Sequence, residues 1–392
     1  MSAFCFYQIL FWIPVGLLFY SYILYPIILE IIFLLKGKSK INEPPTTNYE
    51  PTISILLSVF NEEKVIEEKI KNIFESDYPT DKLEIIIGND CSSDSTREII
   101  TRQETRNPKL ITRNFDVRRG KPAVLNDLVK AANGEIILLT DANIFFEKDA
   151  IKKLVAHFND AKIGLVGGNI INKASGKGIS NQEKTYINRE NRIKFLEGKN
   201  LGSMIGPFGG FYALRKNLYQ TVPENFLVDD FFICMNVLEQ NFKSIAEPEA
   251  IAYEEVSEDW KQEYKRKARI SAGNFQNLLH FESLLLQFNG TAFCFFSHKV
   301  LRWFGPFFIL IAFLISIPLA FAEQSGFYDY ILMVQIVLFI SPFIQRLLEA
   351  IQWQNPIWKT ISYFYTMNFA LLNGWFRFIK GIKSGAWTPT KR

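Results

Sequence analysis

Residues 135–143 read EIILLTDAN, a short apolar run that ends in a carboxylate and an amide. The segment 136–140 is too short and too rich in β-branched residues for a helix, so we predict a buried strand. In an open, mainly parallel α/β sheet, ligands bind beyond the carboxyl ends of the strands. Asp141 and Asn143 are therefore candidates to hold a ligand or a hard cation. The alternative is that Asp141 only caps a helix near Glu147.

Apolar runs and helical patterns alternate along the rest of the domain. Further strands are expected at 53–59, 83–88, 110–113, 163–171, 243–246 and 250–254. Helices are expected at 61–73, 92–103, 120–134, 148–158, 183–195 and 229–239. Asn61 is the expected N-cap of the first helix. The alternation predicts a doubly wound α/β sheet, in which the strand at 83–88 also ends in polar residues, Asn89 and Asp90.

Long uncharged stretches indicate a membrane protein. Residues 4–29 and 303–322 carry no charge and are long enough to span a bilayer as helices. The uncharged runs 330–345 and 360–376 are of marginal length. We expect 360–376 to be an interfacial or re-entrant helix, because two asparagines interrupt it and a span there would leave the basic C-terminus outside the cell.

Three lysines after the first apolar run indicate its orientation. Lys36, Lys38 and Lys40 follow it at once, and basic residues are enriched in cytoplasmic loops, so the N-terminus is expected outside and the chain from residue 36 inside. We predict, in chain order, a transmembrane anchor at 1–36, a linker at 37–51, a cytosolic α/β domain at 52–272, an amphipathic interfacial segment at 273–302, C-terminal transmembrane and interfacial helices at 303–380, and a basic tail at 381–392.

Composition argues against several other classes of protein. The four cysteines show no paired spacing, which fits a reducing compartment and no disulfide framework. Three scattered histidines and no cysteine pairs argue against a zinc site. The net charge of +4 is modest and gives no support for nucleic-acid binding.

Three further stretches each have a structural and a functional interpretation. Asp229 and Asp230 open a helix, where acids either satisfy backbone N–H groups or supply a general base. Arg266 and Arg269 share one helix face, which is either a solvated or headgroup-facing surface or a clamp for a diphosphate. The segment GPFGGFYAL at 206–214 either lets a sugar ring approach the backbone or forms glycine-bounded turns between two strands.

Six motifs occur in a familiar order along the α/β domain. They are SVFNEE at 58–63, NDCSSDST at 89–96, GKPAVLN at 120–126, TDAN at 140–143, VDD at 228–230 and KRKARI at 265–270. In these motifs, and in its flanking apolar segments, the chain resembles the membrane-anchored family 2 glycosyltransferases, the broad group that includes cellulose, hyaluronan and poly-N-acetylglucosamine synthases. The similarity covers about residues 51–280. It implies an A-type glycosyltransferase domain with transmembrane helices at both ends.

The resemblance also implies a site for a nucleotide sugar, expected to be a UDP-sugar. The positions that match the family's contacts to this donor are Asn61, Glu62, Asp90, Lys121, Asp141, Arg266 and Arg269. Asn61, Glu62 and Asp90 match contacts to the uracil and ribose, and Lys121 matches a residue near the nucleotide. Arg266 and Arg269 fall where the family holds the diphosphate and the acceptor.

The resemblance further implies a metal and a base. Asp141 matches the first acid of the family's D-x-D motif and Asn143 replaces the second, so the two are expected to bind Mg2+ or Mn2+. Asp230 matches the general base. Asp229 and the glycines Gly209 and Gly210 are expected on the acceptor side of the site or directly behind it.

Two departures from the family pattern shape the functional prediction. Asn143 stands where an acid is usual, and the sequence RKARI lacks the tryptophan that processive members carry in this box. We therefore predict an inverting enzyme of the cell membrane, multi-pass and with a cytoplasmic active site, that adds one or a few sugars to a lipid-linked or saccharide acceptor. UDP-glucose, UDP-N-acetylglucosamine, UDP-galactose and GDP-mannose stay open as donors, and so does the oligomeric state.

Three alternatives stay open beside this prediction. The first is a processive polysaccharide synthase of the same family. The second is a catalytically inactive membrane protein that binds a nucleotide sugar. The third is a transport or structural membrane protein, although the apolar spans contain almost no charge, only Glu30 near the end of the first.

Overall fold

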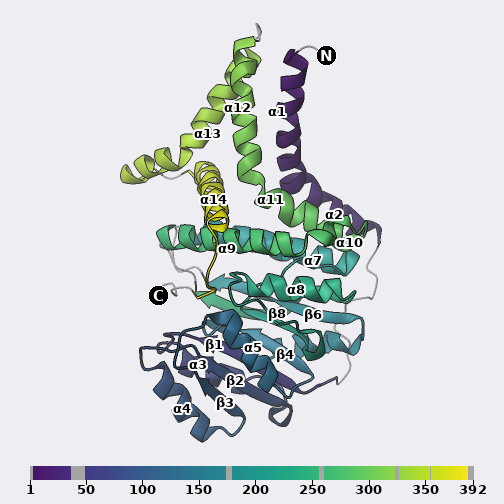
Figure 1. Cartoon of the computed structure of the whole chain (residues 1–392), viewed down its shortest axis with the longest axis vertical. Coiled ribbons are helices and arrows are strands. Elements are labelled where there is room, and N and C mark those ends of the chain that lie inside the picture. The colour runs from purple at the N-terminus through teal and green to yellow at the C-terminus, as the bar shows by residue number, and fades with distance from the viewer. Residues whose placement is uncertain are drawn as a thin grey trace. The chain divides into compact units, whose positions relative to one another are not determined.

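The computed structural model describes residues 3–36, 49–173, 179–255, 260–322, 326–353 and 355–386 (Figure 1). The chain divides into two compact units. The sheet unit comprises Leu29–Glu258, Leu279–Cys294 and Ile382–Arg392, and the helical unit comprises Met1–Ile28, Asp259–Leu278 and Phe295–Gly381. Lys38, Lys40, most of the predicted linker and the end of the predicted basic tail lie outside the described residues.

One half of the sheet is parallel. The strands β3 (Leu110–Asn114), β2 (Leu83–Asn89), β1 (Ile53–Val59) and β4 (Ile136–Thr140) lie side by side in this order. The residues of β1, β2 and β4 are almost all buried, which explains why these segments read as continuous apolar runs. Their parallel register brings the carboxyl ends of β1, β2 and β4 to one edge of the sheet.

The other half of the sheet is mixed. From β4 outward it continues with β7 (Phe211–Arg215), β6 (Ile163–Lys173), β8 (Lys243–Glu255) and β5 (Ile144–Phe146). β7 is antiparallel to both of its neighbours, β6 and β8 are parallel, and β5 is antiparallel to β8. The sheet is therefore less uniformly parallel than the strand and helix alternation suggests, although the α/β class is confirmed.

Helices pack on both faces of the sheet. They are α3 (Ile66–Phe74), α4 (Thr96–Arg106), α5 (Lys121–Ala131), α6 (Ala150–Ala156), α7 (Ile179–Leu201) and α8 (Asp229–Glu239), while the short α10 (Gly290–Cys294) contacts α7. α5 packs on β1 and β2, α6 on β8, and α8 on β6 and β8. Buried isoleucines recur along α3 at helical spacing, as expected for a helix that covers a sheet.

Several predicted boundaries are wrong, for identifiable reasons. The helix predicted from Asn61 begins at Ile66, because Asn61 adopts a left-handed conformation (φ 55°) and its side chain accepts a hydrogen bond from Ser93 N (2.9 Å) instead of capping a helix. The next helix likewise begins at Thr96, four residues later than predicted. The two strands predicted at 243–246 and 250–254 form one strand, β8.

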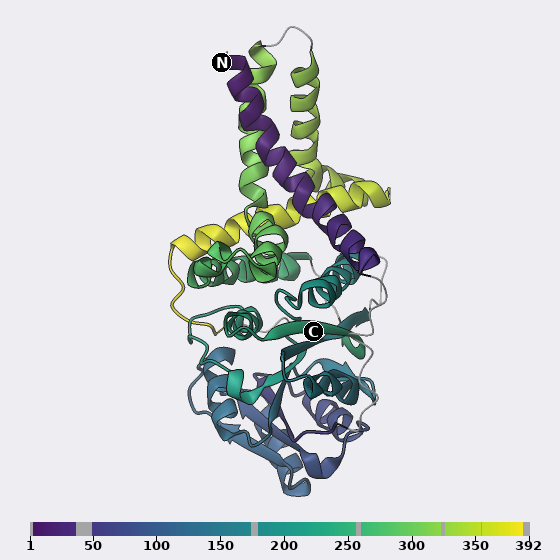
Figure 2. The same ribbon diagram turned by 90° about the vertical axis from the view of Figure 1, so that its right-hand side faces the viewer.

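The helical unit contains apolar helices. Its described segments include α1 (Ala3–Phe19), the start of α2 (Tyr25–Leu35), most of α9 (Trp260–His280), α11 (Leu301–Trp303), α12 (Gly305–Ala322), α13 (Phe327–Ala350) and α14 (Pro356–Ile379). Within the described residues, three helices are long and apolar enough to span a membrane: Phe4–Leu35, Gly305–Ala322 and Phe327–Ala350. α14 is not among them, and it crosses α12 instead of running alongside it (Figure 2).

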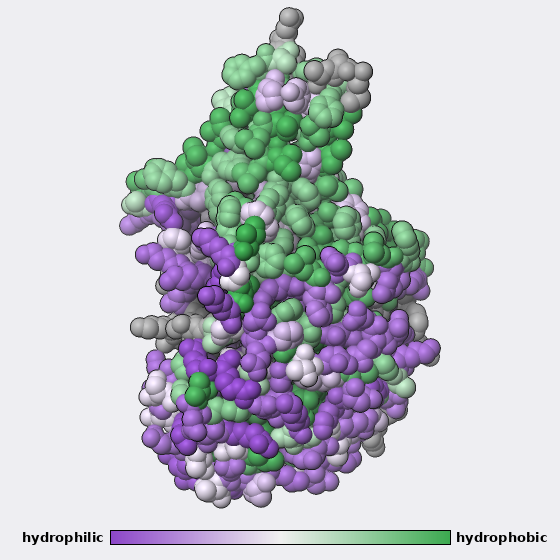
Figure 3. Space-filling view, viewed as in Figure 1, coloured by the Kyte–Doolittle hydropathy of each residue, from purple (hydrophilic) through white to green (hydrophobic). Residues whose placement is uncertain are grey.

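The apolar helices also show on the surface of the molecule. Phe11 of α1 and Leu319 of α12 belong to one buried cluster, which Tyr328 of α13 joins, while many other apolar side chains of these helices are exposed. In the face shown in Figure 3, hydrophobic surface gathers on these helices and the sheet unit is mainly hydrophilic. Exposed apolar helices of this length are typical of a bilayer-facing surface.

Candidate active site

A cleft lies beyond the carboxyl ends of β1, β2 and β4, where parallel α/β sheets bind ligands. Five of the predicted site residues line this cleft: Glu62, Asp90, Lys121, Asp141 and Asn143. The other lining residues are Ser58, Val59, Phe60, Arg118, Gly120 and Ala142. Sequence motifs that lie up to 85 positions apart, from Ser58 to Asn143, therefore meet in one place.

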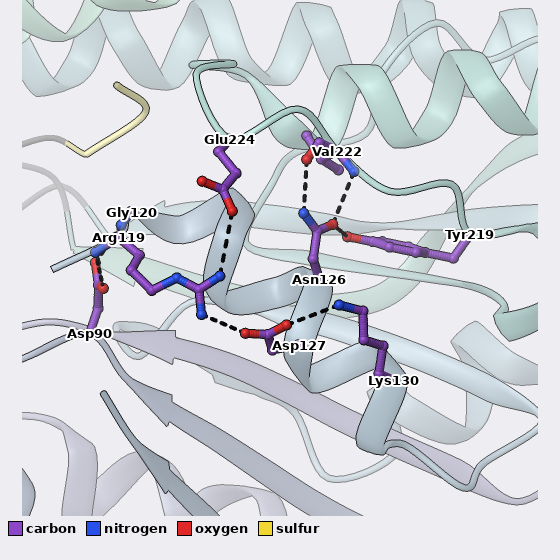
Figure 4. Close-up of polar contacts among 9 residues, drawn as sticks. All are labelled: Asp90, Arg119, Gly120, Asn126, Asp127, Lys130, Tyr219, Val222 and Glu224. Carbon is purple, nitrogen blue, oxygen red and sulfur yellow. Dashed lines mark hydrogen bonds and ion pairs between the residues drawn. The ribbon is translucent and has the colours of Figure 1, made fainter. Parts of the chain in front are cut away.

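Asp90 is buried at the end of β2 and fixes the loop opposite. Its Oδ1 accepts a hydrogen bond from Arg119 N (2.7 Å) and its Oδ2 accepts one from Gly120 N (2.9 Å), as Figure 4 shows. Gly120 can present its amide in this way because its φ of 91° suits glycine. A carboxylate oxygen has more than one lone pair, so Asp90 keeps acceptor capacity on the cleft side while it holds the GKP loop.

The helix after this loop is tied to the segment that leads to Asp230. Asn126 on α5 donates to Val222 O (2.8 Å) and accepts from Val222 N (3.0 Å) and from Tyr219 Oη (2.8 Å) (Figure 4). In the same view, Arg119 Nη1 lies 2.5 Å from Asp127 and Nη2 lies 3.4 Å from Glu224. These bonds connect the parallel half of the sheet to the chain that carries the VDD motif.

Lys121 is the cation that joins the predicted acids. Its Nζ lies 2.8 Å from Asp141 Oδ1 and 3.8 Å from Asp229 Oδ2. Burial alone would lower the pKa of Lys121, but attraction by Asp141, Asp229 and Asp230 outweighs it and raises the pKa. Lys121 is therefore charged at neutral pH and partly neutralises three carboxylates.

Asp230 occupies the first turn of α8 and has the properties of a base. Burial and repulsion from Asp229 raise its pKa to about 6, against the lowering effect of Lys121. A carboxylate with a pKa near the working pH can accept a proton efficiently. A Cβ on Gly209 would lie 2.9 Å from Asp230 Oδ2, so this turn passes close to the carboxylate and a larger residue there would displace it.

The donor set around Asp141 fits a hard cation that is shared with a ligand. Asp141 and Asn143 flank the turn after β4, and the side chain of Asp141 is 40% exposed. Asn143 Nδ2 donates to Glu254 Oε1 (3.2 Å), so the amide oxygen is the atom of Asn143 that suits a cation. Within the described part of the chain, no group of three or more acids, histidines or cysteines is arranged for a metal, so most ligands would come from a phosphate-bearing ligand and water.

Other predicted residues have different surroundings. Asn61 does not line the cleft, and with Ser93 it fixes the loop that precedes α3. Gly209 and Gly210 form the turn before β7, which agrees with the structural alternative for this stretch, glycine-bounded turns between strands. Gly210 O accepts a hydrogen bond from Thr140 Oγ1 (2.8 Å). Arg266 and Arg269 lie on α9 in the helical unit, and their contact with a diphosphate stays a prediction.

Some residues of the site were not singled out in the sequence. The guanidinium of Arg118 stacks on the ring of Phe60 at 3.7 Å, and both residues line the cleft. Tyr212 of β7 is fully buried, and burial together with Asp229 and Asp230 raises its pKa. The neighbouring GKP motif could have drawn attention to Arg118, but Tyr212 reads as an ordinary strand residue.

Known proteins resemble this chain in sequence and in fold. The sequence model of the family described as Glycosyl transferase family 2 matches residues 54–221. Residues 54–221 form a family 2 glycosyltransferase domain. The resemblance predicted from the six motifs is thereby confirmed for the domain that contains the cleft.

Curated relatives carry related names. The chain is 28% identical over 246 residues to the protein named "Probable glycosyltransferase YdaM" of Bacillus subtilis (strain 168), and the match covers 59% of this chain and 57% of the relative. It is 26% identical over 280 residues to the poly-beta-1,6-N-acetyl-D-glucosamine synthase of Staphylococcus aureus (strain COL), over 67% of this chain and 66% of the relative. The match thus spans less than two thirds of each relative's length.

A solved structure shares the fold. The mannosyltransferase PcManGT from Pyrobaculum calidifontis, solved in complex with GDP-Man and Mn2+, superposes with a TM-score of 0.70 over 94% of this chain and 99% of that chain. The two sequences are 20% identical. This likeness shows that the two chains share a fold.

Proposed function

We propose that the protein is a membrane-bound inverting glycosyltransferase that moves a sugar from a nucleotide sugar to a lipid-linked or saccharide acceptor. The proposal rests on the position of Lys121, which lines the cleft and forms ion pairs with both Asp141 and Asp229. A cation between the acid that follows β4 and the acids that open α8 joins the donor-binding side to the base. Separate structural roles for these motifs would not require such a junction.

The cleft suits a nucleoside diphosphate. Glu62 and Asp90 offer acceptors for the hydroxyls of a ribose and the N–H groups of a base, and the stacked pair of Arg118 and Phe60 forms one wall. The ammonium of Lys121 can neutralise charge on the leaving diphosphate. A UDP-sugar is the proposed donor.

The proposed reaction is one displacement at the anomeric carbon. The acceptor oxygen forms a bond to the anomeric carbon while the bond from that carbon to the diphosphate oxygen breaks, and the nucleoside diphosphate leaves with the electron pair. The acceptor's proton passes to Asp230, whose pKa of about 6 leaves it mostly ionised at neutral pH. Attack opposite the leaving group inverts the anomeric configuration.

A divalent cation is part of the proposal. Asp141 and Asn143 would hold Mg2+ or Mn2+ together with the diphosphate, since two oxygen donors plus phosphates and water satisfy these ions. Such a cation supplies Lewis-acid stabilisation of the leaving diphosphate. Arg266 and Arg269 are proposed to add positive charge to the same group, or to contact the acceptor.

The proposed location is the cell membrane, with the sheet unit in the cytoplasm. Three helices of sufficient length and hydropathy support membrane association, and the hydrophilic surface of the sheet unit suits an aqueous compartment. Lys36 directly after the first apolar helix favours a cytoplasmic position for the chain that follows.

A processive synthase is the second candidate. It is favoured by the match to a protein named as a poly-beta-1,6-N-acetyl-D-glucosamine synthase. Short products are favoured by the missing tryptophan in the segment 265–270. Sizing the products made from a radiolabelled UDP-sugar separates the candidates, because a processive enzyme yields long polymer even at low substrate turnover.

The proposed function is tested by assaying the purified full chain with a panel of UDP- and GDP-sugars, Mn2+ and membrane lipid extract. We expect release of the nucleoside diphosphate that depends on acceptor, and loss of that release when Asp230→Asn is used. Donor binding without turnover in every combination would favour an inactive nucleotide-sugar-binding protein instead.

A further inference from the structure

Lys69 is a charged residue at a core position of α3. The helix turns its apolar face to the sheet with Ile66, Ile70 and Ile73, all fully buried or nearly so, and Lys69 lies on the same face with 0% of its surface exposed. Burying an ammonium is costly unless specific partners compensate it. The reaction proposed above gives Lys69 no role, so its contacts need a separate explanation.

The ammonium of Lys69 contacts both ends of the turn that carries Asp141 and Asn143. Its Nζ donates to Thr140 Oγ1 (3.1 Å), the residue before the turn, and to the carbonyl oxygen of Ile144, the residue after it. The third neighbour is the ring of Phe146, whose centroid lies 3.5 Å from Nζ. One buried amine therefore fixes the separation between the two ends of this turn.

The same contacts reach the glycine turn beside the proposed base. Thr140 Oγ1, which accepts from Lys69, donates to Gly210 O at 2.8 Å. The preceding residue, Gly209, passes so close to Asp230 that an added Cβ would lie 2.9 Å from its Oδ2. A chain of contacts thus runs from Lys69 through Thr140 to the turn that borders Asp230.

We propose that Lys69 is a positioning residue that holds the Asp141–Asn143 turn in the shape needed to bind a divalent cation together with the donor diphosphate. The proposal rests on the proposed function, since it assigns the cation to Asp141 and Asn143. The side chain of Asp141 is 40% exposed and the turn lines the cleft, so the geometry of the turn depends on the buried contacts behind it. Partners behind metal ligands typically change metal affinity or activity by about 10- to 100-fold when removed.

The support does not depend on Lys69 being charged. Burial lowers its pKa well below the usual value, against attraction by Asp141. A neutral amine still carries N–H donors for Thr140 and Ile144. The geometry of the contacts carries the proposal, whichever protonation state prevails.

Asn72 offers a matched control on the same helix. One turn further along α3, its side chain donates to Phe146 O (2.9 Å) and accepts from Phe146 N (2.8 Å). It therefore ties α3 to β5 as Lys69 does, but at the end of β5 remote from Asp141. If Lys69 served only to attach α3 to β5, the loss of Asn72 would have similar consequences.

The test measures Mn2+ binding directly. Full-length wild type, Lys69→Met and Asn72→Ala are titrated with Mn2+ by electron paramagnetic resonance in detergent at saturating UDP. We expect the apparent Mn2+ dissociation constant to rise about 10-fold or more in Lys69→Met and to change less than about twofold in Asn72→Ala. In turnover assays, Lys69→Met should require more Mn2+ but recover most of its kcat when Mn2+ is saturating, whereas a folding defect would lower kcat at every Mn2+ concentration.

The outcomes separate this inference from the proposed function. If Lys69→Met binds Mn2+ as tightly as a wild type that does bind Mn2+, only the role of Lys69 is overturned and the proposed function stands. If Mn2+ binding weakens equally in Asn72→Ala, the role of Lys69 is also overturned, because any loss of contact between α3 and β5 would then have the same effect. If the wild type binds no Mn2+ in the presence of UDP, the proposed metal site fails instead.

A second variant covers the case in which Lys69→Met does not fold. Thr140→Val keeps the size and β-branching of the strand residue and removes the hydroxyl that accepts from Lys69 and donates to Gly210. We expect it to weaken Mn2+ binding about 2- to 10-fold. Wild-type affinity in a folded Thr140→Val protein would contradict the proposal.

Discussion

The parallel and the mixed halves of the sheet contribute differently to the candidate site. From the parallel half, the ends of β1, β2 and β4 supply the cleft with Glu62, Asp90 and Asp141. From the mixed half come the glycine turn before β7 and, through α8, Asp229 and Asp230. Under the proposed function, the parallel half binds the donor and the mixed half supplies the base for the acceptor.

The comparison shows where the two halves depend on each other. Asp141 follows β4, the strand at the border between the halves, and Lys121 forms ion pairs with both Asp141 and Asp229 of the mixed half. Asn126 provides a second link, through Val222 and Tyr219. Changes confined to one half should therefore affect either donor binding or the chemical step, and changes at the links should affect both.

The largest expected effect comes from the mixed half. Replacing Asp230 with Asn removes the proposed base, so we expect the rate of transfer to fall about 10²- to 10⁴-fold. Donor affinity should stay within about twofold, because the donor is assigned to the parallel half. Transfer rates and calorimetric UDP binding measure the two quantities separately.

Glu239→Gln is the control for this experiment. Glu239 is an exposed acid at the other end of α8, so its loss should leave transfer and donor binding unchanged. A transfer rate in Asp230→Asn similar to that of the control would remove the base from the account. A collapse of donor binding would show that the division between the halves is wrong.

Lys121→Met should give the next largest effect. It leaves three carboxylates without their shared cation and removes positive charge from the leaving-group side, so we expect kcat to fall about 10²-fold. Donor affinity should fall as well, unlike in Asp230→Asn. If only kcat or only donor affinity changed, Lys121 would not be the junction that we infer from its two ion pairs.

The pH dependence sharpens the assignment of the base. Asp230 can accept a proton only as a carboxylate, and its pKa is raised to about 6, so kcat/KM should fall as the pH drops through about 6 and level off above it. Asp229→Asn removes the repulsion that raises this pKa and should move the acid limb to lower pH. Lys121→Met removes a cation that lowers the pKa and should move the limb to higher pH.

Shifts of the acid limb in the reverse directions would contradict the stated effects of Asp229 and Lys121 on the pKa of Asp230. A profile that is flat between pH 5 and 7 would exclude Asp230 as the titrating base. The measurement needs only initial rates under low donor concentration across this range, with the buffer ionic strength held constant because surface charges are screened by salt.

Asn126→Ala should give the smallest effect on chemistry. It removes three hydrogen bonds between α5 and the segment 219–222 and leaves buried polar groups unpaired, so we expect the free energy of unfolding to fall by about 1–3 kcal/mol. Lys130→Ala is the control on the same helix, because its ion pair to Asp127 is exposed and contributes little. Denaturant unfolding should show no such loss in the control.

The parallel half could be predicted well from the sequence. The strands β1 and β4 begin and end where predicted, because strands buried on both faces read as unbroken apolar runs. The expectation that Asp90 and Asp141 lie at one sheet edge also follows from this half, since parallel register aligns the strand ends.

The mixed half could not be predicted as well. β5 has only three residues, and β7 lies in a glycine-rich stretch with two equally plausible interpretations, so neither has a local signal. Lys69 reads as a polar residue on an amphipathic helix, and only its burial distinguishes it. The pairing of Lys121 with Asp229 joins residues 108 positions apart and is a product of topology, which periodicity does not encode.

The most direct measurement is a structure of the full chain with UDP and Mn2+ bound. We expect the nucleoside beside Asp90 and Glu62, the metal on Asp141 together with the diphosphate, and the carboxylate of Asp230 facing the space where an acceptor would attack. UDP bound elsewhere, or a metal held by other residues with Asp141 still paired to Lys121, would contradict it.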